Sequence, residues 1–150
     1  MTIDQSGEVR VANGRTGGGP RHLQLTLPAS GQPVRLARQV AREVLTAWRL
    51  TSVEETAILL VSELVTNAVR DAASSDVITL ELEVVHAYLR IESYRCRPGL
   101  AMPRTTGEFD ESGFEFALVH ALADTWGVRE SVTGKTAWAK INVGSEPGLR

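Results

Sequence analysis

Apolar and polar residues alternate in five stretches of the chain, and this alternation predicts strands with one buried face. Leu23, Leu25 and Leu27 give the clearest example, which Pro28 ends. Short gaps separate the second stretch from the third and the fourth from the fifth, so each pair is predicted to form a hairpin. The predicted strands cover residues 22–30, 77–85, 88–95, 126–130 and 136–143.

Three other stretches carry apolar residues three or four positions apart, which is the spacing of one helix face. They predict helices at 32–50, from 52 to about 72, and at 113–124. Ser52 and Glu55 fit a capping box, in which each side chain accepts a backbone N–H at the start of the second helix. Strands in hairpins, with helices grouped beside them, indicate an α+β fold with a mostly antiparallel sheet.

The remaining segments have no period and are rich in glycine, proline and polar residues. Residues 1–22 and 144–150 are therefore predicted to be tails, with one domain at 23–143. Residues 96–112 hold two prolines and two glycines and predict a long loop. Loops of this length in a small domain are usually functional or mobile.

Composition narrows the classes of protein to consider. The 150 residues suit one domain, with 43% hydrophobic and 23% charged residues. A net charge of −2 gives no bulk attraction to nucleic acid or to an anionic membrane. The only cysteine is Cys96, so no disulfide can form within the chain. No apolar run is long enough for a membrane span and no signal pattern opens the chain, so we expect a cytoplasmic protein.

The second predicted helix carries a polar pair within the stretch SELVTNAVRDA at 62–72. At 100° per residue, Glu63 and Asn67 lie close together on a different face, far from the centre of the apolar stripe, with Arg70 beside them. A solvated helix flank explains such a pair. Alternatively, a carboxylate can accept a proton and a carboxamide oxygen can bind Mg²⁺, and four-residue spacing lets both reach one ligand. Spacing alone leaves both interpretations open.

The surroundings of this pair resemble a known family. The segment 59–72 looks like the N box of the Bergerat-fold (GHKL) ATPases, and most resembles the branch of anti-sigma-factor serine kinases. Segments 35–50, 112–128 and 134–141 resemble the first long helix, the glycine-bearing helix with its following strand, and the last hairpin strand. The resemblance implies a two-layer sandwich, a mixed, mostly antiparallel sheet backed by three helices, and an ATP and Mg²⁺ site beneath a lid.

Carried over by position, the family's roles fall on a few residues of this chain. The resemblance implies that Glu63 is the catalytic base and that Asn67 holds Mg²⁺ and the phosphates. Thr136 would hold the adenine edge through water. Arg70 and Asp71 complete the expected nucleotide-binding helix end, and the 96–112 loop would be the lid.

Two positions depart from the family's pattern. Where the family has an aspartate that accepts from the adenine amino group, this chain has Arg95, which offers donors only. Where the family has two glycines near the phosphates, this chain has Gly113 but then Glu115, whose charge would oppose a polyanion. Together the two changes would weaken ATP binding by on the order of 100-fold or more.

Three functions remain open on this basis. The first is a kinase-like regulator that binds a sigma factor or an anti-anti-sigma protein with weakened or lost ATP binding. The second is an active ATP- and Mg²⁺-dependent protein serine/threonine kinase that phosphorylates an anti-anti-sigma partner. The third, an ATPase half of a sensor kinase, is the weakest, because no phosphoacceptor helix is evident. Arg95 and Glu115 favour the first, and by resemblance the protein would form a homodimer.

Overall fold

The computed structural model describes residues 2–3, 7–12, 21–73, 75–96 and 116–144. Its helices are α1 (Pro33–Ala47), the short 3₁₀ helix η1 (Thr51–Val53), α2 (Glu54–Arg70) and α3 (Ala117–Leu122). Its strands are β1 (Thr2–Ile3), β2 (Gly7–Ala12), β3 (His22–Pro28), β4 (Val77–Val85), β5 (Tyr88–Cys96), β6 (Thr125–Glu130) and β7 (Gly134–Asn142).

The strands form one sheet in the order β1-β2-β3-β4-β5-β7-β6. Every pair within the described residues is antiparallel. The α+β class is thus confirmed, but the expected mixed sheet is wrong. Some neighbouring strands are joined by a hairpin turn. The others are joined by a longer connection that also returns the chain in the opposite direction, so these pairs are antiparallel too.

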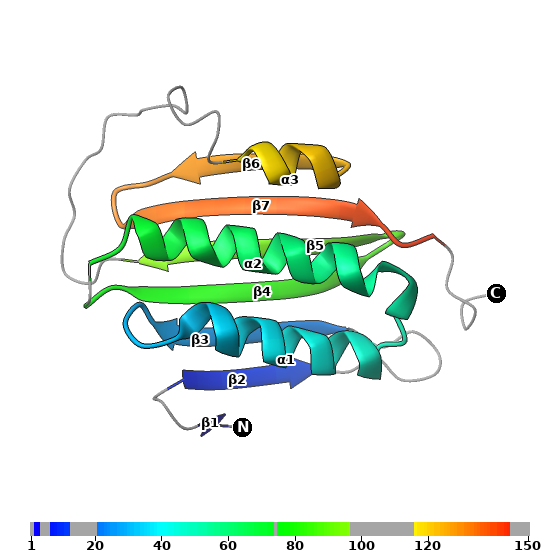
Figure 1. The fold of residues 1–150 in the computed structure, drawn as a ribbon, viewed down its shortest axis with the longest axis horizontal. Helices are drawn as coiled ribbons and strands as arrows, with labels where there is room; N and C mark the ends of the chain where they lie inside the picture. Colours follow the sequence, from blue (N-terminus) through cyan, green and yellow to red (C-terminus); the bar gives the residue numbers. More distant parts are fainter. Residues whose placement is uncertain (1, 4–6, 13–20, 74, 97–115, 145–150) are drawn as a thin grey trace.

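The helices α1, α2 and α3 cover one face of the sheet, so the molecule has two layers (Figure 1). Alternation along the strands turns Leu25, Leu80 and Ile91 towards the helices, where each is fully buried. Ala41, Leu60 and similar residues of α1 and α2 complete one continuous hydrophobic core. This packing fixes the position of α2 over β5 and β7, where the candidate site lies.

The other face of the sheet carries charged side chains. Arg90 donates to Glu83 and Glu92, with nitrogen–oxygen distances of 2.7 and 2.9 Å. Burial alone would lower the pKa of Arg90, but the hydrogen bonds and charges of these two carboxylates raise it above its ordinary value. The guanidinium therefore stays charged and links neighbouring strands across this face.

Two local predictions are wrong. The first is the tail over residues 1–22, because β1 and β2 lie within this segment and β2 pairs with β3. Backbone hydrogen bonding along a free sheet edge adds a strand without needing a hydrophobic composition. The second is the Ser52–Glu55 capping box, because η1 occupies this position and α2 begins with Val53 as its N-cap, without a side-chain cap.

Candidate functional site

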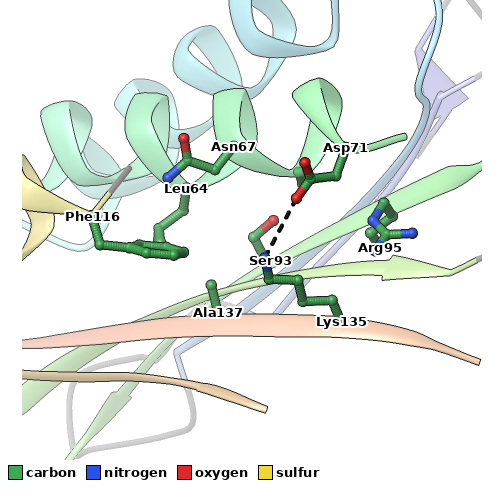
Figure 2. A pocket seen from close by; sticks show the side chains of 9 residues that line it. Leu64, Asn67, Asp71, Ser93, Arg95, Phe116, Lys135 and Ala137 are labelled. Carbon is green, nitrogen blue, oxygen red and sulfur yellow. Dashed lines mark hydrogen bonds and ion pairs between the residues drawn. The ribbon is translucent and has the colours of Figure 1, made fainter. Parts of the chain in front are cut away.

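A small cleft lies between the C-terminal half of α2 and the strands β5 and β7 (Figure 2). Its empty space of about 250 Å³ includes the open mouth, so the enclosed part is much smaller than a usual small-molecule pocket. Apolar groups form part of its wall and polar groups form the rest. The cleft is lined by Leu64, Asn67, Ala68, Asp71, Ser93, Arg95, Phe116, Lys135 and Ala137.

Asn67 lines this cleft and is only 4% exposed. The expectation that it lies far from the buried face of its helix is wrong. Because α2 packs against α1, α3 and the sheet, its buried arc is wider than one apolar stripe. The carboxamide oxygen of Asn67 accepts a hydrogen bond from Arg70 at 2.9 Å. Arg70 itself is exposed and does not line the cleft.

Glu63 lies one helical turn before Asn67 but is not among the residues that line the cleft. Its side chain is partly exposed. The structure therefore brings Asn67 and Asp71 to the cleft and leaves the expected catalytic base outside it.

The floor of the cleft is polar because β5 changes character along its inward face. Leu89 and Ile91 are followed at the same alternation by Ser93 and Arg95, which are 2% and 5% exposed. Arg95 forms an ion pair with Asp76, whose side chain is fully buried, at 3.7 Å. Asp76 also accepts the backbone N–H of Ala73 at 2.9 Å. A carboxylate from the α2–β4 connection thus compensates the buried guanidinium.

The mouth of the cleft is crossed by a second ion pair. Lys135 lies opposite Arg95 in the register of β5 and β7. Its ammonium group is 3.4 Å from the Asp71 carboxylate and 5.8 Å from the centre of the Phe116 ring (Figure 2). Asp71 and Lys135 are partly exposed, so solvent screens this pair more than the buried one.

The remaining predicted site residues separate into two groups. Thr136 pairs with Tyr94 on the opposite face of the sheet, because Lys135 and Ala137 on either side of it face the cleft. The structure therefore does not bring Thr136, the expected contact of the adenine edge, together with Asn67 and Asp71. Gly113, Glu115 and nearly all of the expected 96–112 lid lie outside the described residues.

The sequence patterns did not single out three residues at or beneath the cleft, namely Ser93, Asp76 and Lys135. A signal for Ser93 was present, since it continues the inward alternation of Leu89 and Ile91. Asp76 and Lys135 gave no comparable signal, because a pairing between separate elements depends on the fold.

The residues present do not fit an adenine ring. The exocyclic amino group of adenine needs a strong acceptor, whereas Arg95 and Lys135 are donors only and the Ser93 hydroxyl beside them is a neutral, weaker acceptor. The carboxylates beside them, on Asp76 and Asp71, already lie in ion pairs. Within the described residues, no three histidine, cysteine, aspartate or glutamate side chains cluster as metal ligands. A magnesium ion would therefore depend on Asn67, whose oxygen is held by Arg70.

The chain matches no family model and no curated protein. In the part of the chain that the structure describes, no helix has the length and apolar character needed to cross a membrane. The geometry of the cleft is therefore the main evidence for function.

Proposed function

We propose that this protein is a Bergerat-fold regulator of the anti-sigma-factor serine kinase type with weakened or lost ATP binding. It binds a sigma factor or an anti-anti-sigma protein in the cytoplasm. Four stretches in the family's order support the assignment, and so does the α+β sheet with its helices on one face. One observation supports the loss of ATP binding most strongly: Arg95 and Lys135, facing each other on β5 and β7, present donors where a purine would need an acceptor.

The alternative is an active serine/threonine kinase of the same family. The position of Asn67 favours it, because a side chain that would bind Mg²⁺ and phosphates lines the cleft. Against it, Glu63 lies outside the cleft and Asn67 is already bonded to Arg70. The kinase alternative requires that Glu63→Ala abolish phosphate transfer to a partner serine in a folded protein.

Titration of the protein with ATP and Mg²⁺ by calorimetry separates the two functions. The regulator should show no saturable heat below millimolar nucleotide, because each missing hydrogen bond to a buried group costs about 1–3 kcal/mol. Binding in the micromolar range would overturn the proposal. Purified sigma factors and anti-anti-sigma proteins should bind equally well with and without ATP, and a strict need for ATP would favour the kinase.

Restoring an acceptor to the floor of the cleft tests the same explanation in reverse. Arg95→Asp alone would place a second carboxylate beside buried Asp76 and is expected to destabilise the protein. The triple variant Arg95→Asp, Asp76→Asn, Lys135→Ser avoids this repulsion and should bind ATP at least about tenfold more tightly than the native chain. The matched control is Arg95→Met, Asp76→Asn, Lys135→Ser, which removes the same charges without adding an acceptor at position 95. An equal gain in this control, or no gain in the folded Arg95→Asp variant, would contradict the explanation.

A further inference from the structure

The floor of the cleft contains two buried polar atoms with unmet hydrogen-bonding capacity. The hydroxyl oxygen of Ser93 and the Nε of Arg95 have no hydrogen-bond partner within the described residues. Leaving such a group unpaired in the interior costs about 1–3 kcal/mol. Both residues line the same cleft and come from the same strand face, so one ligand could satisfy both.

The chemistry of these atoms specifies what the ligand must offer. Arg95 Nε–H can only donate, and the Ser93 hydroxyl can donate once an acceptor is present. Lys135 adds a cation at the mouth of the same cleft. Donors from three side chains that line one cleft fit a ligand with several acceptor oxygens and a negative charge.

The size and charge of the cleft limit this ligand further. The space of about 250 Å³ includes open solvent, and the enclosed part has room for little more than one water-sized group, so only one end of a small ligand can reach the floor while the rest lies at the mouth. Arg95 is compensated by the buried Asp76, whereas the Asp71 carboxylate beside Lys135 is partly exposed. A ligand could take the place of Asp71 beside Lys135, because a partly exposed ion pair contributes only about 0–1 kcal/mol and the aspartate can turn into solvent.

We propose that this cleft binds a small oxyanion, either a carboxylate or an inorganic phosphate-sized anion. Ser93 and Arg95 donate to its oxygens from the floor, Lys135 pairs with it at the mouth, and Asp71 opposes its entry. Such a site lies beyond the proposed regulatory function and does not depend on it. ATP binding would overturn that function and would leave the oxyanion site to its own test.

The full chain, labelled with ¹⁵N, provides a direct test by NMR. Sodium phosphate and sodium acetate are titrated separately, with sodium chloride at the same ionic strength as the reference. The Arg95 Nε–H resonance should shift saturably with at least one of the two oxyanions and not with chloride. A response to acetate identifies a carboxylate site, and a response to phosphate alone identifies a phosphate site. No saturable shift with either anion would overturn the proposal.

Two substitutions with opposite expected effects show whether the binding is specific. Ser93→Ala removes a donor and should weaken binding about tenfold or more without loss of stability, since the hydroxyl has no hydrogen-bond partner within the described residues. Asp71→Asn removes a competing negative charge and should strengthen binding severalfold. Because Asp71 is exposed, this variant stays informative even if Ser93→Ala does not fold.

Thr79→Val is the matched control for Ser93→Ala. It removes a hydroxyl from β4 on the opposite face of the sheet, where Thr79 pairs with Tyr94. Its affinity for the oxyanion should equal that of the native chain. The proposal fails if Thr79→Val weakens binding as much as Ser93→Ala, or if Asp71→Asn weakens it.

Discussion

The role assigned to Arg95 changes once its surroundings in the fold are known. In the sequence it is a donor at a position where the resembling family has an acceptor. In the structure it is also one half of a buried ion pair with Asp76, which belongs to a different element. The side-chain chemistry was therefore predictable, whereas the partner was not, because ion pairs between distant residues follow from tertiary packing.

Removing one partner of the Arg95–Asp76 pair should destabilise the protein strongly, whereas replacing both partners together should destabilise it less. Asp76→Ala leaves a buried guanidinium without its carboxylate and should lower the free energy of unfolding by about 3–5 kcal/mol. Asp76→Asn combined with Arg95→Met removes both charges, and the introduced carboxamide keeps an oxygen for the Ala73 N–H. Urea unfolding should show the double variant to be more stable than Asp76→Ala. The reverse order would mean that the pair does not control stability here.

Whole elements were predicted more reliably than their contacts. The predicted strands at 77–85 and 88–95 agree with β4 and β5 to within one residue, because alternation in a half-buried strand is a strong signal. For α2 the predicted length was close, but the apolar stripe alone puts Asn67 on the wrong face. Such a stripe identifies the residues that pack against one neighbouring element, whereas α2 packs against α1, α3 and the sheet.

The β5–β7 pairing, which holds Arg95 and Lys135 together, can be tested at one glycine. A Cβ on Gly134 would collide with the backbone carbonyl of Arg95. Because a paired strand cannot move aside easily, Gly134→Ala should cost about 1–3 kcal/mol and disturb the cleft.

At Gly127 the colliding atoms are in the side chain of Trp138, at 2.7–2.9 Å. A side chain can move more easily than a paired strand, so Gly127→Ala serves as the control and should cost less. Thermal unfolding of both variants measures the difference. Equal losses would show that the close approach to Arg95 is not limiting.

At the scale of the whole molecule, helices cover one face of the sheet (Figure 1), and the other face carries linked charges. Hydrophobic periodicity in the sequence predicts the two layers. It does not predict the strand order or the addition of β2, since backbone pairing at a sheet edge leaves little trace in composition. Because helices do not cover the charged face, its stability depends on the cross-strand contacts of residues such as Arg90.

Arg90 should therefore contribute more than an ordinary surface cation. It lies 2.7 Å from Glu83, 2.9 Å from Glu92 and 3.9 Å from Glu81, and its side chain is 24% exposed. Arg90→Gln leaves three neighbouring carboxylates without their shared cation and should cost about 1–2 kcal/mol in urea unfolding at low salt. The cost should shrink at about 1 M salt, because screening reduces the repulsion among the glutamates.

The pH dependence of this contribution follows from the direction of the pKa shift. The pKa of Arg90 is raised in the folded state. The stability that its charge contributes is therefore fully present below the unfolded pKa and is lost only as pH rises through the folded pKa. Both lie in strong alkali, so titration of Arg90 itself should not change the cost between about pH 6 and pH 9. Arg129→Gln is the matched control, because Arg129 pairs with Glu92 alone among the described residues and is 64% exposed. A control loss as large as that of Arg90→Gln would show that the outer face gains nothing from the shared contacts of Arg90.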